Sequence, residues 1–279
     1  MENIILNDGY SLPLIGFGTY KTEDTLMSVQ AAIESGYRLI DTASIYGNEK
    51  EVGEAVKRTT VPRQHLYITS KVWRTDLGYD ATRKAFRNTL KRLSLEYLDL
   101  YLIHWPANSK NYKDWVKVNA ETWRAMEELQ DEGLIRSIGV SNFWPEHLEE
   151  LLNTATVPPA VNQIEYHPGY QQTTVVDYCQ RHNIALQAWS PLARGRFQDH
   201  PLLNEIAGRH GKTVSQIILR WTVQQGLLPL PKSSRPQRIK ENIDIFDFEL
   251  SRDEMSAVTN MQPQGFSGER PDIWPDRIN

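Results

Sequence analysis

The sequence predicts an α/β fold, a (β/α)8 or TIM barrel in which eight parallel strands alternate with helices. Eight strand-like segments recur along the 279 residues, and most begin apolar and end in a polar or chargeable residue. Amphipathic helical patterns separate them, which is typical of a parallel sheet. The length is close to the roughly 250 residues that such a barrel commonly fills as one domain. We therefore expect one barrel domain over residues 1–279.

The predicted strands follow one another without a linker, a repeat or a low-complexity tract. They span residues 16–20, 37–44, 66–71, 98–104, 135–142, 160–167, 184–191 and 227–233. A doubly wound open sheet is the main alternative. A GxGxxG turn after the first strand would favour it, but the first segment, GFGTY, has no such motif. Before the first strand, Asp8-Gly9 is a strong turn signal between two short apolar runs. We expect a β-hairpin there that plugs the lower end of the barrel.

The helices are predicted from apolar residues at helical spacing and from terminal signals. Thr213 and Gln216 form a capping box, and Pro145 suits the first turn of a helix. Gly36 suits a position just after a helix. The apolar faces that identify the helices are Leu26, Val29 and Ile33; Phe86, Leu90 and Leu93, in a helix opened by Asp80; Trp115 to Leu129, ended by Gly133; and Val214, Ile217, Ile218 and Trp221.

Composition limits the classes of partner. A formal net charge of −4 argues mildly against a nucleic-acid-binding protein, which would usually be basic. The single cysteine, Cys179, cannot form an intrachain disulfide, which fits a reducing compartment. The sequence shows no signal-peptide pattern and no apolar run near the roughly 20 residues of a membrane span. We expect a cytoplasmic protein with no membrane and no nucleic-acid partner.

Four residues near three successive strand ends have complementary chemistry: Asp41, Tyr46, Lys71 and His104. Neighbouring strands of a parallel barrel bring their carboxyl ends together, so these side chains are expected to meet. An ammonium near a phenol favours the phenolate and lowers its pKa, and a carboxylate would hold the lysine charged. Histidine can donate a hydrogen bond to a carbonyl oxygen. Tyr46 is then a candidate general acid for carbonyl reduction by hydride from a nicotinamide.

Each of the four also has an ordinary explanation: a turn cap, a surface aromatic, a solvated lysine and a buried histidine. Other enzyme classes remain open at this point. Asp41, His104, Glu165 and His167 have the right chemistry for zinc, although this leaves Lys71 and Tyr46 without a role. A Schiff-base aldolase would need Lys71 uncharged, which Asp41 opposes. A regulatory protein that binds cofactor without turnover is the third alternative.

Six segments closely resemble the aldo-keto reductase family: IDTASIYGNE, ITSKVW, LDLYLIHWP, IRSIGVSNF, NQIEYHP and PKSSRPQRIKEN. The resemblance runs from GFGTY to FDFEL. It implies a (β/α)8 barrel, an NADPH/NADP+ cofactor, a small-molecule carbonyl substrate, no metal, a monomer, and a catalytic tetrad of Asp41, Tyr46, Lys71 and His104. Tyr46 would be the proton donor, Lys71 and Asp41 would tune it, and His104 would orient the carbonyl.

The resemblance also implies a set of cofactor-binding residues. Ser141, Asn142 and Gln163 match the carboxamide-binding set, and Trp189 matches the aromatic residue that stacks on the nicotinamide. Gly18 and Thr19 match a loop beside the cofactor, and Ser190 and Leu192 match the segment along the pyrophosphate. The residues expected around the adenosine phosphate and adenine are Lys232, Ser233, Arg238, Glu241 and Asn242.

The segment 232–240 supports a phosphate site on physical grounds as well. It carries four cations, Lys232, Arg235, Arg238 and Lys240, in an acidic protein. Pro236 is expected to open a helix, and helix N-termini attract phosphate. Arginine can bind phosphate through two hydrogen bonds. We therefore expect NADPH in preference to NADH.

The substrate pocket is less determined by the sequence. Tyr20, Trp73 and Trp105 occupy family positions that often line it, and residues 107–113 and 266–274 are expected as variable loops over the opening. Arg196 and Arg270 are candidates for attracting an acidic substrate. The short tail resembles a bacterial branch that includes 2,5-diketo-D-gluconate reductases. The expected substrates are aldehydes, ketones, dicarbonyls and keto sugar acids.

Overall fold

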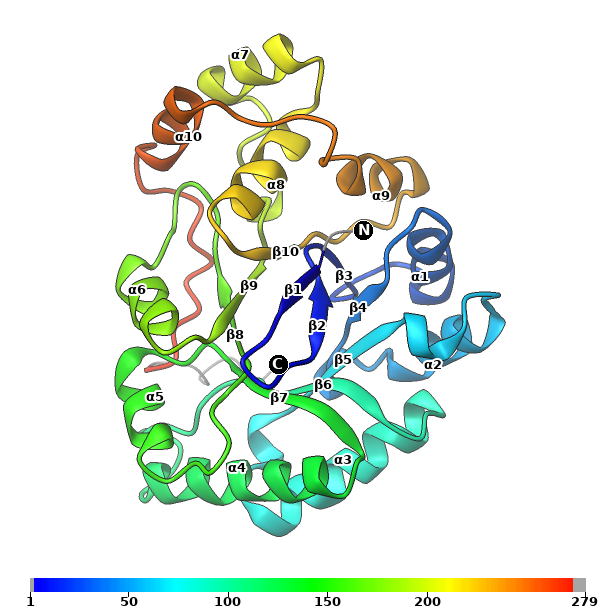
Figure 1. Ribbon diagram of the computed structural model, residues 1–279, viewed down its shortest axis with the longest axis vertical. Coiled ribbons are helices and arrows are strands. Elements are labelled where there is room, and N and C mark those ends of the chain that lie inside the picture. The colour runs from blue at the N-terminus through cyan, green and yellow to red at the C-terminus, as the bar shows by residue number, and fades with distance from the viewer. Residues whose placement is uncertain (1–2, 273–279) are drawn as a thin grey trace.

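The computed structural model describes residues 3–272 and contains the predicted barrel (Figure 1). Eight parallel strands lie in the order β10-β9-β8-β7-β6-β5-β4-β3, so neighbours in the barrel are also neighbours in the chain. The strands are β3 Gly16–Gly18, β4 Leu39–Asp41, β5 Tyr67–Val72, β6 Leu98–Ile103, β7 Ile135–Ser141, β8 Val161–Glu165, β9 Ala185–Trp189 and β10 Leu228–Leu230. Each predicted strand is present. β5 has the length of its predicted segment but begins and ends one residue later, and the other seven strands are shorter than predicted.

Helices surround this barrel (Figure 1). They are α1 Thr25–Glu34, α2 Glu49–Arg58, α3 Tyr79–Leu93, α4 Trp115–Asp131, α5 Pro145–Leu152, α6 Thr173–Arg181, α7 Pro201–His210, α8 Val214–Gln224, α9 Pro236–Ile243 and α10 Arg252–Thr259. Four short 3-10 helices, η1 Ser44–Tyr46, η2 Arg63–His65, η3 Arg74–Asp76 and η4 Ala193–Gly195, lie in the connections.

The first and last strands close the barrel. The Gly18 amide donates a hydrogen bond to the carbonyl of Pro231, just after β10, with N and O 3.0 Å apart. A Cβ on Gly18 would lie 3.1 Å from the Leu230 carbonyl oxygen, tighter than ordinary contacts. Glycine, which has no Cβ, therefore suits this position at the seam, where β3 meets β10. The closure brings α9 beside α1, so the cationic segment lies near the start of the chain (Figure 1).

The barrel interior has an apolar lower layer. Leu6 and Leu12 come from the predicted hairpin, whose strands are β1 Asn3–Ile5 and β2 Ser11–Pro13, with Gly9 at φ +86° in the turn. Both leucines pack against inward residues of the barrel strands, including Leu39 and Leu100. The hairpin crosses one end of the barrel in Figure 1 and plugs it. The hairpin therefore covers this end, and the polar strand ends predicted as the site lie at the other.

The helix signals are largely confirmed. Thr213 and Gln216 form the capping box of α8, and Pro145 is in the first turn of α5. Asp80 does not open its helix: α3 begins one residue earlier, at Tyr79, after Gly78 at φ +99°. Gly78 can adopt this conformation without strain, so it determines where the helix starts.

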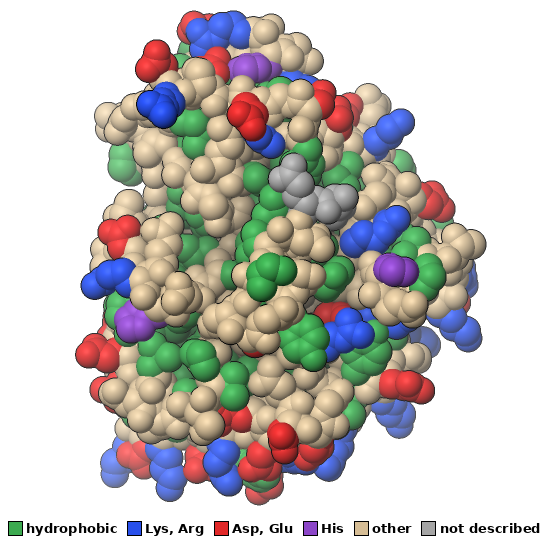
Figure 2. Space-filling view, viewed as in Figure 1, with side chains coloured by type: hydrophobic (Ala, Val, Ile, Leu, Met, Phe, Trp, Pro, Cys, Tyr) green, Lys and Arg blue, Asp and Glu red, His purple; other side chains and the backbone are tan. Residues whose placement is uncertain are grey.

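The surface around the hairpin is mixed in charge. Figure 2 shows apolar side chains near the centre of this face, and acidic and basic side chains interspersed around its edge. Within residues 3–272, no helix is both long enough and apolar enough to span a bilayer.

Candidate active site

The centre of the candidate site is a buried ion pair between neighbouring strands. Asp41 ends β4 and Lys71 lies near the end of β5, and both point into the barrel. Lys71 Nζ lies 2.6 Å from Asp41 Oδ1 and donates a second hydrogen bond to the Thr42 carbonyl at 2.9 Å. Lys71 is fully buried and Asp41 is 4% exposed. Burying two charges is costly unless further hydrogen bonds satisfy them. Here the Thr42 carbonyl accepts a hydrogen bond from Lys71, and Gln163 donates one to Asp41.

Tyr46 lies above this pair on η1. Its hydroxyl oxygen is 3.5 Å from Lys71 Nζ, and the same Nζ is 5.1 Å from the centre of its ring. Gly47 ends the turn at φ +72°, a conformation that glycine adopts readily. Ser44 Oγ donates to the Lys71 carbonyl at 3.1 Å, which ties the turn to β5. The Tyr46 hydroxyl is thus held next to the ammonium.

His104 follows β6 and completes the group. Its ring centre lies 5.5 Å from that of Tyr46 and 5.1 Å from that of Trp73, both edge to face. Asn142 Nδ2 donates to the His104 carbonyl at 3.0 Å, which fixes the backbone at that strand end. Nδ1 of His104 is buried and has no hydrogen-bond partner in the described part of the chain. The structure therefore brings all four tetrad residues together.

The protonation of these groups is dominated by burial. Burial raises the pKa of Tyr46 well above 10, with Asp41 adding to the rise. This is opposite to the lowering expected from Lys71, because the phenolate would lose hydration and Asp41 already pairs with the ammonium. Burial likewise lowers the pKa of Lys71, an effect that Asp41 opposes, and the pKa of His104, an effect that Lys71 increases. Tyr46 is protonated and His104 neutral near neutral pH.

A second group of polar side chains follows β7, β8 and β9. Ser141 Oγ donates to the Gln163 carbonyl at 2.8 Å, and Trp189 Nε1 donates to Asn142 Oδ1 at 2.8 Å. Asn142 has φ +62°, a left-handed conformation that asparagine tolerates better than most residues. Gln163 Nε2 donates to Asp41 Oδ2 at 2.9 Å. The four residues predicted to contact a nicotinamide are therefore connected to each other and to the tetrad.

Four further residues predicted to bind cofactor lie at or just after the ends of β3 and β9, the two strands on either side of β10. Gly18 is at the seam itself, and buried Thr19 donates from its Oγ1 to the Asp41 carbonyl at 2.9 Å. Ser190 has φ +49°, so the chain turns sharply after β9, and Leu192 follows in that loop, half-buried. Sparsely populated backbone conformations of this kind cluster at functional sites.

The cationic segment begins just before α9 and continues to Lys240 in the last turn of this helix. Lys232, Arg235, Arg238 and Lys240 are exposed, and none forms an ion pair with another residue in the range 3–272. The Arg235 amide donates to Ser233 Oγ at 3.1 Å, while Asn242 is buried and Glu241 accepts from Gln237. Cations available at a helix N-terminus fit a phosphate group. The residues present therefore fit a nicotinamide cofactor with an added phosphate.

The predicted pocket residues differ in exposure. Tyr20 is 49% exposed, with its ring centre 4.9 Å from that of Tyr46, whereas Trp105 is only 4% exposed. Arg196 Nη1 donates to the Gly265 carbonyl at 2.7 Å. Arg270 pairs with Asp272 through Nη2 and Oδ2 at 2.8 Å. Both arginines are thus occupied by the protein itself. Ile273 and Trp274, predicted as part of the second loop, lie outside the described residues.

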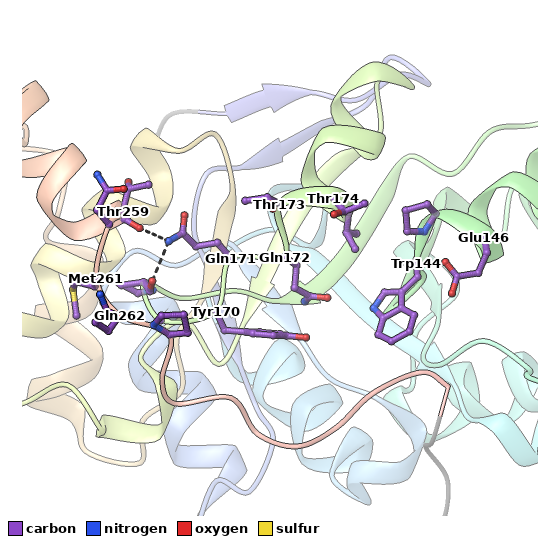
Figure 3. Close-up of a pocket in the computed structure, with 16 residues that line it drawn as sticks. Trp144, Glu146, Tyr170, Gln171, Gln172, Thr173, Thr174, Thr259, Met261 and Gln262 are labelled. Atoms are coloured by element: carbon purple, nitrogen blue, oxygen red, sulfur yellow. Dashed lines mark hydrogen bonds between the residues drawn. The ribbon is translucent and has the colours of Figure 1, made fainter.

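A cleft of about 870 Å³ lies beside this group rather than within it. It is lined by the starts of α5 and α6 and by the chain after α10, with Trp144, Tyr170 and Gln171 among its walls (Figure 3). Gln171 Nε2 donates to the Thr259 carbonyl across it at 2.6 Å. None of the predicted site residues lines this cleft, so the candidate chemistry is located at the barrel mouth.

Two residues near the tetrad were not predicted as part of the site. Gln187 accepts a hydrogen bond from Gln163 Nε2 at 2.9 Å inside the barrel, and Glu269 adds to the rise in the Tyr46 pKa. A polar residue within the otherwise apolar segment IALQAW was a visible signal for Gln187. No local sequence pattern predicts that Glu269 lies near the site. Its segment is brought there by tertiary contacts, such as that between Glu269 and Arg194.

The zinc alternative finds no support in the geometry. Glu165 and His167 are neighbours, with Oε1 and Nε2 3.5 Å apart, but Asp41 is paired with Lys71. Among the described residues, no three His, Cys, Asp or Glu side chains are placed to hold a metal ion.

Comparison with known proteins agrees with this architecture. The model for the aldo/keto reductase family matches residues 14–262. A glyoxal reductase from Bacillus subtilis (strain 168) is 48% identical over 274 residues, covering 97% of this chain and 96% of the relative. The Bombyx mori aldo-keto reductase solved with NADP is 36% identical, with a TM-score of 0.85 and coverage of 92% of each chain. A mutant of Gox0644 solved with NADPH is 38% identical, with a TM-score of 0.89 and coverage of 97% of each chain.

Proposed function

This chain belongs to the aldo/keto reductase family of oxidoreductases, and on that premise we propose that it reduces small aldehydes and dicarbonyls to alcohols with NADPH. The observation that carries the proposal is the tetrad geometry. Lys71 Nζ lies 2.6 Å from Asp41 Oδ1 and 3.5 Å from the Tyr46 hydroxyl, with the His104 ring beside Tyr46. When bound, NADPH supplies the hydride that the carbonyl carbon receives.

The chain's own residues would move the proton and orient the substrate. Tyr46 holds its proton because burial raises the pKa of its hydroxyl, so it can donate that proton to the carbonyl oxygen. Lys71 next to it would stabilise the phenolate that forms, and Asp41 holds the ammonium in place. His104 is neutral, and because its Nδ1 is enclosed without a partner among residues 3–272, Nε2 is the nitrogen for the carbonyl oxygen.

NADPH would be held along one side of the barrel mouth. Ser141, Asn142 and Gln163 would contact the carboxamide, and Trp189 would pack on the ring. Arg238 and the neighbouring cations would bind the 2′-phosphate. Two structural neighbours solved with NADP or NADPH support this choice of cofactor.

The charge around the mouth favours uncharged substrates. Glu269 contributes negative potential at Tyr46, and Arg196 and Arg270 are engaged by Gly265 and Asp272. The Bacillus subtilis relative named glyoxal reductase supports a small dicarbonyl. Keto sugar acids are the second candidate substrate class, because the short C-terminal tail resembles that of 2,5-diketo-D-gluconate reductases. The monomeric state, the cytoplasmic location and the branch assignment stay predictions.

The deciding experiment is steady-state oxidation of NADPH, with NADH in parallel, against glyoxal, methylglyoxal, simple aldehydes and a keto sugar acid. We expect NADPH to be consumed fastest with the uncharged dicarbonyls. A higher kcat/KM for the keto sugar acid would reverse the order of the two substrate classes. No turnover with any carbonyl, despite tight NADPH binding, would favour a regulatory cofactor-binding protein.

A further inference from the structure

Gln187 is a buried polar residue inside the barrel that the proposed mechanism does not use. It lies in the middle of β9, where its Cα partners are Gln163 on β8 and Leu228 on β10. Its side chain is fully buried, above the apolar layer that includes Leu228. Burying an amide is costly unless it is hydrogen-bonded, so its contacts indicate what it does.

Those contacts form a continuous chain of hydrogen bonds to the tetrad. Gln163 Nε2 donates to Gln187 Oε1 and to Asp41 Oδ2, both at 2.9 Å. The other oxygen of Asp41 accepts from Lys71 Nζ at 2.6 Å. Because the amide nitrogen has two hydrogens, these two acceptors use both of them.

This arrangement determines which way the Gln163 amide faces. The Asp41 carboxylate only accepts, so the nitrogen of Gln163 must face it, and Gln187 presents its oxygen to the same nitrogen. Gln163 Oε1 is left on the other side, and within residues 3–272 no group donates a hydrogen bond to it. An acceptor oriented in this way suits the NH₂ group of a carboxamide.

We propose that Gln187 is a positioning residue for the cofactor: it holds the Gln163 amide so that its oxygen accepts from the nicotinamide carboxamide. The assignment rests on the proposed function. Packing alone does not explain Gln187, because its Nε2 is buried without a partner in the described part of the chain. A methionine of similar shape would fill the space without that unsatisfied donor.

The experiment measures NADPH binding to Gln187→Met by quenching of tryptophan fluorescence, with 2′,5′-ADP as a matched ligand that lacks the nicotinamide. Loss of one hydrogen bond that orients Gln163 predicts a Kd for NADPH raised by about 3- to 10-fold. The Kd for 2′,5′-ADP should not change. An unchanged Kd for NADPH, or an equal loss for both ligands, would overturn the assignment.

Two further variants protect the test against a folding defect. Gln187→Asn keeps the amide but shortens the side chain by one methylene, so it should weaken NADPH binding in the same selective way. Gln187→Glu keeps an acceptor oxygen within reach of Gln163 and should restore most of the affinity. If Gln187→Glu binds NADPH as weakly as Gln187→Met, the acceptor is not what matters and the assignment is wrong.

A double-mutant cycle with Gln163→Met tests whether Gln187 acts through Gln163. In the Gln163→Met background, Gln187→Met should have no further effect on NADPH affinity. If Gln187→Met weakens NADPH binding equally in both backgrounds, the assignment of Gln187 is wrong and the proposed function still stands. Failure of the wild-type protein to bind NADPH would instead overturn the proposed function, and the assignment with it.

Discussion

Lys71 and Asp41 form an ion pair inside the barrel, with Nζ and Oδ1 2.6 Å apart and with 0% and 6% of their side chains exposed. The two residues come from adjacent parallel strands and are 30 positions apart in the chain. Their pairing places a fixed positive charge beneath the Tyr46 hydroxyl. It also makes the stability of the barrel and the chemistry of its mouth depend on the same contact.

Breaking this pair should destabilise the protein. Asp41→Asn leaves a buried ammonium without its counter-charge, and removing one member of such a pair costs about 3–5 kcal/mol. Urea unfolding would measure the loss. Glu54→Gln, at the exposed Arg58–Glu54 pair, is the matched control and should unfold almost like the wild type. An Asp41→Asn variant as stable as that control would contradict this account.

Removing the Tyr46 hydroxyl should abolish most reduction without removing the cofactor site. Tyr46→Phe takes away the proposed proton donor, whose contribution is of the order of 10²- to 10⁴-fold in kcat. NADPH binding, followed by quenching of tryptophan fluorescence, should persist because the proposed phosphate site is elsewhere, at α9. Turnover close to the wild-type rate would rule out Tyr46 as the acid.

Removing Arg238 should change cofactor preference. A charged hydrogen bond to the 2′-phosphate contributes about 1.5–3 kcal/mol, so Arg238→Ala should raise the KM for NADPH by about 10- to 100-fold. The KM for NADH, which lacks that phosphate, should change little. Arg252→Ala, an exposed arginine on α10, is the control. Equal effects on both cofactors would mean that Arg238 does not contact the phosphate.

His147 should make the protein lose stability on acidification. Burial lowers its pKa to about 4, an effect that Asp272 partly opposes, and its Nδ1 accepts from the Trp144 amide at 3.2 Å. The unfolded chain therefore binds a proton that the folded chain does not, in the range between about pH 6.5 and 4. Stability should fall as pH drops through that range, with about 3 kcal/mol of the loss due to His147.

His147→Asn tests this assignment, since its Oδ1 can still accept from the Trp144 amide. Urea midpoints measured between pH 7 and pH 4 should fall less steeply for the variant than for the wild type. Buried His104 contributes in the same direction in both proteins, so the difference isolates His147. Parallel curves would show that His147 titrates normally.

Ser267 should hold the C-terminal segment over the mouth. Its Oγ donates to the buried Glu165 carboxylate at 2.7 Å and accepts from the Glu269 amide at 3.1 Å. Ser267→Ala removes both bonds, so amide hydrogen exchange in residues 265–272 should quicken by on the order of tenfold. Ser256→Ala, exposed on α10, is the control. Unchanged exchange would show that other contacts, such as that of Arg196, hold the segment.

The sequence by itself determined that polar residues lie at or near the carboxyl ends of the strands. Alternating strands and helices specify a parallel barrel, and in such a barrel the strand ends carrying Asp41, Lys71 and His104 must meet at one mouth. The hairpin at Asp8-Gly9 and the capping box of α8 follow from equally local rules. These features were predictable because each depends on residues that are close together in the chain.

Only the tertiary structure decided the contacts across the barrel and the degree of burial. Gln163 meets Asp41 although 122 positions separate them, and Gln187 joins them only once the strands close. The pKa of Tyr46 rises rather than falls because closure removes water from its hydroxyl and pairs Lys71 with Asp41. Desolvation and long-range contact depend on the whole packed chain, which local patterns do not specify.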